Sequence, residues 1–225
     1  MSSSVDRAYP YLVPPICAGV AIVPVFRDLM PKSAQQLGKI PNVSLREGVK
    51  EGIKASRTVG VLVGSQMILQ GAVERNLTQN DGSLEAKLKS SAIVGFFSSP
   101  VVAIFNGQSM KWRALKSLRR LNSKQALAIT VQESAFVGGI SAADKLAAVM
   151  KSRFGDNKAV EYSAAFASGA MGSLVGHPAN TALTRWQAGL KVTSARQLMW
   201  GSMRKARAVG AFSVLYRLGK EVLGH

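Results

Sequence analysis

Apolar and polar stretches alternate along the whole chain. Six stretches contain almost no charged residue, and they cover about residues 9–31, 58–73, 91–110, 125–143, 162–184 and 208–223. An amphipathic helix of a soluble protein carries charged residues at nearly every turn, and these stretches do not. Each approaches the roughly 20 residues that a helix needs to cross a membrane. The pattern predicts an all-α membrane protein with six transmembrane helices.

Three prolines recur through these stretches at a nearly constant interval. Pro24 and Pro100 are 76 residues apart, and Pro100 and Pro178 are 78 residues apart. A long-period repeat indicates copies of one unit that buries its apolar face only against its neighbours. A proline inside a helix removes a hydrogen bond and kinks the helix. We expect a single domain over residues 1–225, made of three pseudo-repeated helical hairpins. The repeats cover approximately residues 9–77, 86–147 and 162–225.

Positive charge is concentrated in alternate polar segments. The chain has 29 Lys and Arg against 12 Asp and Glu, a net charge of +17. Residues 32–57 contribute +4, and residues 111–124 and 185–207 contribute +6 each, while the other polar segments are close to neutral. This is the positive-inside pattern of multi-pass proteins, and it predicts both termini on the side opposite these loops.

The alternative is a soluble helical protein with a basic face for nucleic acid. No apolar stretch reaches about 18 consecutive purely apolar residues, which leaves this alternative open. However, residues 58–73 and 91–110 carry no charge at all. The basic segments also lack the interleaved aromatic residues that stack on single strands. We therefore expect no nucleic-acid partner.

Reactive residues are scarce. One cysteine, Cys17, excludes an internal disulfide, and two histidines make a histidine-based metal site improbable. No catalytic dyad, phosphate-binding loop or metal-ligand cluster is present. The N-terminus has no basic segment before an apolar stretch and does not resemble a secretory signal. The sequence predicts no enzymatic activity, no metal and no cofactor.

The third repeat carries the most specific motif. Pro178 is followed by Arg185 seven residues later and by Gln187 nine residues later, in the segment PANTALTRWQ. This segment resembles the signature of the mitochondrial carrier family, which has a proline, an acid two on, bases five and seven on, and a glutamine nine on. The segment MWGSMRKAR, residues 199–207, resembles the family's aromatic/basic–glycine stretch, and residues 49–54 are a weaker copy. The resemblance implies an inner mitochondrial membrane protein with matrix-facing basic loops and termini toward the intermembrane space.

The chain departs from the family where the family carries gate charges. The resemblance implies a ring of acid–base pairs that closes the matrix side near Pro24, Pro100 and Pro178. The acid positions hold Phe26, Val102 and Asn180, and the base positions hold Leu29, Phe105 and Leu183. Such a ring can close by packing, but it offers no charge network for a substrate to displace. We expect these six residues, together with the three prolines, to form a degenerate matrix gate.

On the opposite side, the family has an acid and a base at the end of each even-numbered helix. Here the candidates reduce to one possible bridge, between Asp144 and Lys220, although Glu221 could replace the acid. By resemblance, cardiolipin would bind at helix N-termini near Gly52 and Gly201, where backbone N–H groups attract an anion. These glycines could equally be helix-start residues only.

Glu133 is the one ionisable residue deep inside an expected span. A charge at the centre of a membrane helix costs about 2.5–3.5 kcal/mol, so such residues are candidates for function. We expect Gln66, Glu133 and Arg207 to line a central cavity, with Arg207 or Arg57 as the partner of Glu133. The alternative is a self-satisfied polar cluster between helices that binds no ligand.

Two functions follow from these patterns. The favoured one is a non-transporting accessory subunit of a respiratory complex of the inner mitochondrial membrane, such as cytochrome oxidase or the ATP synthase. Its partners would be other subunits of that complex and the membrane, with cardiolipin. The alternative is an active mitochondrial carrier that exchanges a small metabolite.

Overall fold

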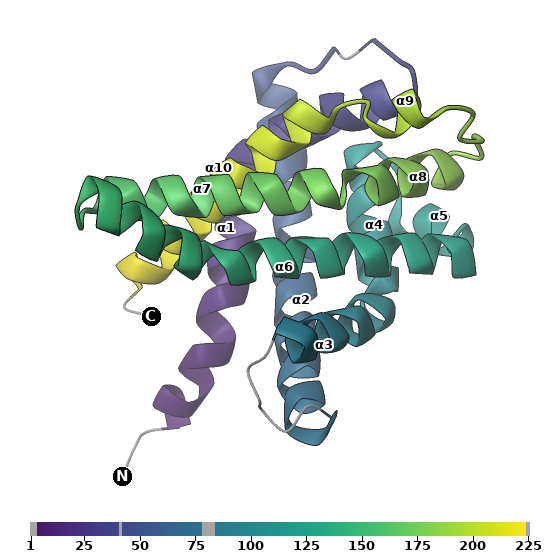
Figure 1. Cartoon of the computed structure of the whole chain (residues 1–225). Helices are drawn as coiled ribbons and strands as arrows, with labels where there is room; N and C mark the ends of the chain where they lie inside the picture. The colour runs from purple at the N-terminus through teal and green to yellow at the C-terminus, as the bar shows by residue number, and fades with distance from the viewer. Residues whose placement is uncertain (1–3, 41, 78–83, 224–225) are drawn as a thin grey trace.

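The computed structural model describes residues 4–40, 42–77 and 84–223, and within these residues the protein is helical and has no strand (Figure 1). The helices are α1 (Ser4–Gln36), α2 (Leu45–Leu77), α3 (Leu84–Phe97), α4 (Ser99–Ser109), α5 (Ala114–Arg119), α6 (Ser123–Phe154), α7 (Lys158–Val175), α8 (His177–Gln187), α9 (Ala195–Leu198) and α10 (Ser202–Val222). The predicted all-α class is confirmed.

The long helices close into a ring in chain order. α1 packs on α2, α2 on α3, α3 on α6, α6 on α7, α7 on α10, and α10 returns to α1. In Figure 1 the α6–α7 pair runs across the α1–α2 pair, and both termini lie away from α8 and α9. The ring brings side chains from sequence-distant helices to a common interior.

Two of the three repeated prolines stand just after a break between helices. α3 and α4 meet at Ser98 with a bend of 68°, and Pro100 lies in the first turn of α4. α7 and α8 meet at Gly176, and Pro178 lies in the first turn of α8. A proline fits there because its missing N–H would have no helical partner. Pro24 differs, since it lies exposed within α1, which continues without a break.

Three polar loops gather at one end of the ring. Residues 37–44, 110–122 and 188–201 follow α1, α4 and α8, and the ends of these three helices are joined by side-chain hydrogen bonds. We call this the basic end, because most of the excess Lys and Arg residues lie in or next to these loops. The opposite end, where α6 is connected to α7 and α10 finishes, is called the far end.

The far end is held by ion pairs between α6, α7 and α10. Glu161 accepts from Lys151 at 2.5 Å and pairs with Arg217 at 3.0 Å. Glu221 pairs with Lys158 at 3.1 Å and accepts from the Tyr162 hydroxyl at 3.0 Å. The hydrogen bonds to Asp156 and Glu161 raise the pKa of Lys151 above its usual value. These charges are partly exposed, so each pair contributes little to stability.

Only some of the described helices are long and apolar enough to cross a membrane. By length and composition, Leu12–Gln36 could cross a membrane, and a second span exists if Lys89–Phe97 and Ser99–Ser109 count as one bent helix. Among the described residues, the other helices do not meet this criterion. The six predicted spans are therefore not confirmed by length and hydropathy.

Gly52 corrects one sequence-based expectation. It lies buried inside α2, which begins seven residues earlier at Leu45, so it is not at a helix N-terminus. A Cβ on Gly52 would be 2.5 Å from the Val23 carbonyl oxygen and 3.2 Å from the Phe26 Cβ. The glycine is needed for the close approach of α1 and α2, and no anionic headgroup can reach its backbone N–H.

We expect Gly52→Ala to lower the free energy of unfolding by about 1–3 kcal/mol, because the added methyl group overpacks the α1–α2 contact. Gly60→Ala, on the same helix, is the matched control. The nearest atom to its added Cβ is the Pro15 carbonyl oxygen at 3.4 Å, an ordinary contact. It should be neutral or slightly stabilising, since alanine favours helices. Denaturant unfolding of the purified protein measures both, and equal effects would contradict the close approach.

Candidate functional site

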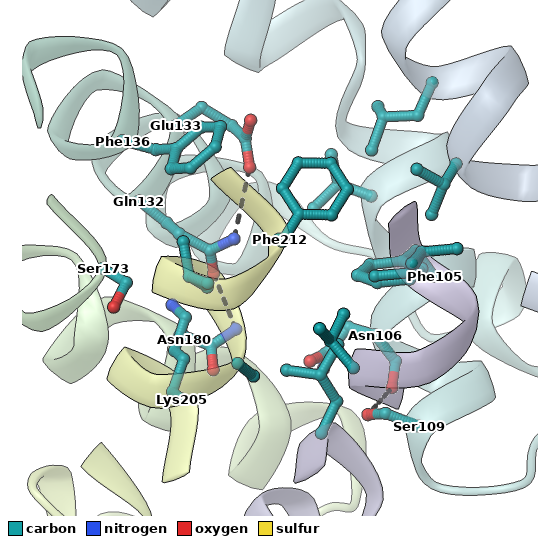
Figure 2. Close-up of a pocket in the computed structure, with 18 of the residues that line it drawn as sticks. Phe105, Asn106, Ser109, Gln132, Glu133, Phe136, Ser173, Asn180, Lys205 and Phe212 are labelled. Atoms are coloured by element: carbon teal, nitrogen blue, oxygen red, sulfur yellow. Dashed lines mark hydrogen bonds between the residues drawn. The ribbon is translucent and has the colours of Figure 1, made fainter. Parts of the chain in front are cut away.

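A cavity of about 160 Å³ lies inside the ring (Figure 2). Its walls are mostly apolar and include Val59, Leu62, Phe105, Phe136 and Phe212. Its polar lining includes Lys32, Gln66, Gln132, Glu133, Asn180 and Lys205. The predicted candidates Gln66 and Glu133 therefore both lie at this cavity.

A chain of hydrogen bonds joins a lysine to Glu133 across the cavity wall. Lys32 Nζ donates to Asn180 Oδ1 at 2.9 Å, and Asn180 Nδ2 donates to Gln132 Oε1 at 2.7 Å. Gln132 Nε2 then donates to Glu133 Oε1 at 3.2 Å. Figure 2 shows the last two of these bonds as dashed lines. Two neutral amides thus connect an ammonium to a carboxylate, and each polarises the next in the same direction.

The second carboxylate oxygen of Glu133 is also satisfied. Gln66 Nε2 donates to Glu133 Oε2 at 3.0 Å and also lies 3.3 Å from Ser98 Oγ, at the break between α3 and α4. Glu133 therefore has a hydrogen-bond donor on each oxygen, one from α2 and one from its own helix.

Arg207 does not line the cavity, and that prediction was wrong. Its guanidinium donates to both oxygens of Asp28, at 2.9 and 2.6 Å, and its side chain is 64% exposed. Lys205 takes the inward position on the same helix. Two residues correspond to about 200° around a helix, so Arg207 and Lys205 point to nearly opposite sides. Arg57, the other proposed partner of Glu133, is exposed on the outer surface of α2.

The apolar gate residues, which we call the apolar ring, are buried in two clusters. Phe26 and Leu29 lie in one cluster, where the Phe26 and Phe105 rings are 6.0 Å apart. Val102 and Leu183 lie in the other. Phe26, Val102 and Leu183 are at most 2% exposed. Asn180 differs from these apolar residues, because it carries the hydrogen-bond chain from Lys32. Of the prolines, Pro24 and Pro100 are exposed and Pro178 is half-buried.

Next to this apolar ring lies a cluster of buried neutral side chains that we call the polar clamp. It consists of Ser33, Gln36, Asn106, Ser109, Thr181, Thr184 and Gln187. Among the described residues, no ion pair joins α1, α4 and α8, the three helices that carry the clamp. The bonds among these seven side chains are therefore neutral, and Lys32 and Arg185 add charged hydrogen bonds between α1 and α8.

The polar clamp joins equivalent positions of successive repeats. Ser33 and Ser109, each nine residues after its proline, have hydroxyl oxygens 2.6 Å apart. Asn106 and Thr184, each six residues after its proline, are bonded at 3.2 Å. Asn106 Nδ2 also donates to Gln187 Oε1 at 2.7 Å. The helices therefore meet in the register that the proline spacing implies.

The arginines near the clamp bond to backbone carbonyls. Arg185 donates through Nη1 to the Gln36 carbonyl at 2.9 Å and through Nε and Nη2 to the Lys191 carbonyl. Arg120 donates to the Gln187 carbonyl at 2.7 Å. Cations at these sites satisfy carbonyl groups that have no helical partner at the C-termini of α1 and α8.

Two further predicted sites have different outcomes. Gly201 is the residue directly before α10 and has φ of 78°, so it does stand at a helix N-terminus. A Cβ there would be 3.0 Å from Lys32 atoms. Lys220 lies 6.0 Å from the Tyr216 ring centre. The side chain of Asp144 lies outside the described part of the structure, so the bridge between Asp144 and Lys220 stays a prediction.

Sequence reasoning missed the polar clamp and the inward Lys32 and Lys205. The clamp had a signal, since a polar residue stands nine residues after each of the three prolines, and six residues after Pro100 and Pro178. The two lysines had none, because both belong to segments that were counted only as basic loops.

No model of a known protein family, no curated protein and no solved structure matches this chain. The residues and contacts described above are therefore the basis for inferring what the protein does.

We expect Asn106→Leu to lower the free energy of unfolding by about 1–3 kcal/mol, because it leaves the buried side-chain oxygen of Gln187, Oε1, without its donor. Asn76→Leu is the control, since Asn76 is exposed and, within the described part of the chain, donates to the Ala72 carbonyl of its own helix. Its effect should stay within about 0.5 kcal/mol. Chemical unfolding measures both, and a silent Asn106→Leu would show that the clamp does not hold the basic end.

We expect the Arg207–Asp28 pair to contribute only about 0.2–1 kcal/mol, because it is solvent-exposed. A double-mutant cycle with Arg207→Ala and Asp28→Ala isolates this coupling from other effects of each change. A coupling of several kcal/mol would mean that Arg207 is buried in a tighter network than its position here shows.

Proposed function

We propose that this protein is a six-helix membrane bundle of the mitochondrial carrier type that does not transport. In this proposal it is a structural accessory subunit of a respiratory complex in the inner mitochondrial membrane, such as cytochrome oxidase or the ATP synthase. The observation that carries the proposal is the polar clamp, a buried neutral closure at the basic end.

Exposed apolar side chains support the membrane part of the proposal. Val20, Val61, Met171 and Val175, on three different helices, are between 62% and 73% exposed. Apolar exposure spread over several sides of a bundle is costly in water, and it is expected where lipid or a partner covers the surface. The net positive loops at one end match the positive-inside pattern and orient the termini toward the intermembrane space.

The closed basic end supports the absence of transport. Alternating access requires each end of the bundle to open in turn around a fixed site. Opening the basic end would separate the clamp bonds and the apolar ring together. A substrate can shift such an equilibrium only by its differential affinity for the two states, and no gate charges are present for it to engage. The closed state is therefore favoured.

Lipid is part of the same proposal. Anionic headgroups attract basic segments next to the membrane, each Lys or Arg contributing about 1 kcal/mol. Gly201, at the N-terminus of α10 on the basic end, is the position where cardiolipin would bind. Other subunits of the complex would cover the remaining exposed surface.

An active carrier of a small metabolite is the second candidate, and Glu133 favours it. A carboxylate in the wall of a central cavity, with donors from Gln66 and Gln132, is a reasonable place to hold a cargo. In that case Glu133→Gln should abolish exchange while the bundle stays folded.

Two measurements separate these functions. We expect purified protein in liposomes to show no saturable uptake of nucleotides, carboxylates or amino acids above empty liposomes. We also expect the native protein to migrate with a respiratory complex on a native gel of mildly solubilised mitochondrial membranes. Saturable exchange that is lost in Glu133→Gln would overturn the structural role, and so would migration only as a free small species.

A further inference from the structure

A groove lies on the outer surface of the bundle between α1 and α2, with a volume of about 620 Å³. We call it the α1–α2 groove. Its apolar walls include Ile16, Val20 and Pro24 of α1 and Ile53 of α2. Among the described residues, Arg57 is the one charged side chain that lines it. Ile16, Val20 and Ile53 are each more than half exposed, so the groove is an open apolar surface with a cation at its edge.

The two helices approach each other closely beneath the groove. A Cβ on Gly19 would be 3.2 Å from the Ser56 carbonyl oxygen. The Ser56 hydroxyl donates to the Ile53 carbonyl at 2.8 Å, so it needs no further partner. The floor of the groove is therefore made of small residues that are already satisfied. Small residues of this kind allow another helix to pack closely.

The outer face of α2 carries two cations without partners. Arg57 and Lys50 are seven residues apart, which places them on one side of the helix and about 10 Å apart along its axis, with Ile53 between them. Both are exposed, and neither makes an ion pair or a side-chain hydrogen bond with another described residue. Lys54 differs, because Glu51 of the same helix pairs with it at 2.7 Å.

The depth of Arg57 indicates what covers it. Its neighbour Ser56 is level with Gly19, and Gly19 is seven residues, about 10 Å, inside Leu12–Gln36, the segment of α1 that could cross a membrane. Ionisable side chains within a membrane span are costly, and they pair with one another. A lipid headgroup sits at one depth, whereas the two cations of α2 lie at different depths. A helix that carries acids can meet both.

We propose that the α1–α2 groove binds a transmembrane helix of a partner subunit that carries two carboxylates seven residues apart. Its apolar side chains fill the groove, and its carboxylates pair with Arg57 and Lys50. Apolar surface alone gives a helix little advantage over lipid, so the ion pairs supply the specificity. This inference rests on the proposed function, because it names the chemistry of a neighbour in the assembly.

Binding of two designed peptides to the purified full chain in detergent tests the inference. Both are apolar helices of Leu and Ala. One has Glu at two positions seven residues apart, and the other has Gln at the same positions. We expect the Glu peptide to bind about tenfold more tightly, as measured by capture of the labelled peptide on the immobilised chain. Phosphatidylglycerol should displace it no better than phosphatidylcholine at equal concentration.

Charge reversal supplies the variant test. The double variant Lys50→Glu with Arg57→Glu should lose the preference for the Glu peptide and should favour a third peptide with Lys at the same two positions. Lys54→Glu is the matched control, because it changes a cation of the same helix that already has an acid partner, and it should keep the preference. Should the double reversal not fold in a thermal unfolding assay, Lys50→Gln with Arg57→Gln removes both charges, and the Glu and Gln peptides should then bind equally.

The same variants can be compared in mitochondrial membranes on a native gel. We expect the natural chain and Lys54→Glu to migrate with a respiratory complex, and the double reversal to migrate as a free small species. The reversal should not unfold the chain, because both positions are exposed.

Four outcomes would overturn the inference. They are equal binding of the Glu and Gln peptides, a Glu preference that survives the double reversal, displacement of the Glu peptide by phosphatidylglycerol alone, which would assign the groove to lipid, and a double reversal that still migrates with the complex. A natural chain that migrates alone but prefers the Glu peptide would reject the respiratory-complex proposal and leave the groove. The two proposals therefore fail separately.

Discussion

Polar side chains buried between helices must find their partners inside the bundle, and this requirement determines how the three repeats meet. The polar clamp meets most of this requirement, and Gln36 Oε1 stays without a partner among the described residues. Ser33 meets Ser109, and Asn106 meets Thr184 and Gln187. A shift of one helix along its axis would separate several of these partners at once. The clamp therefore fixes the positions of α1, α4 and α8 along their axes, and with them the end of the cavity that faces the basic end.

On the cavity side of the clamp, charged side chains also find their hydrogen-bond partners inside the bundle. Lys32 and Glu133 are too far apart in the wall to pair directly, and Asn180 and Gln132 connect them by hydrogen bonds. Losing either amide would leave two buried charges unconnected, which costs more than losing an ordinary neutral bond. The bundle thus places the neutral side chains of the clamp next to a cavity lined by three ionisable ones, Lys32, Glu133 and Lys205.

The all-α class was accessible from the sequence because the alternation of apolar and polar stretches predicts helices. The proline interval predicts three repeats of two helices, and this grouping stays a prediction. Finer placement depends on where each helix begins. For α2 a start signal exists: Ser44 and Glu47 fit the capping-box pattern, and the Glu47 backbone N–H donates to the Ser44 hydroxyl at 3.2 Å, which places Gly52 inside the helix. Arg207 and Lys205 are two residues apart, so an error in the predicted rotation of the helix about its axis turns the wrong one of the two toward the cavity. Contacts between repeats, such as those of the clamp, are tertiary and appear only once the ring is closed.

The two ends of the bundle are closed by interactions of different strength, and this asymmetry connects the cavity to the proposed lack of transport. At the far end, α6, α7 and α10 are joined by partly exposed ion pairs of Glu161 and Glu221, which contribute about 0–1 kcal/mol each. At the basic end, buried neutral hydrogen bonds are combined with an apolar ring, and opening would expose both. The far end is therefore the one that opens at lower cost. In the proposed membrane bundle, a ligand that enters and leaves by the same end is bound without crossing. The difference between the two ends thus supports the proposed lack of transport.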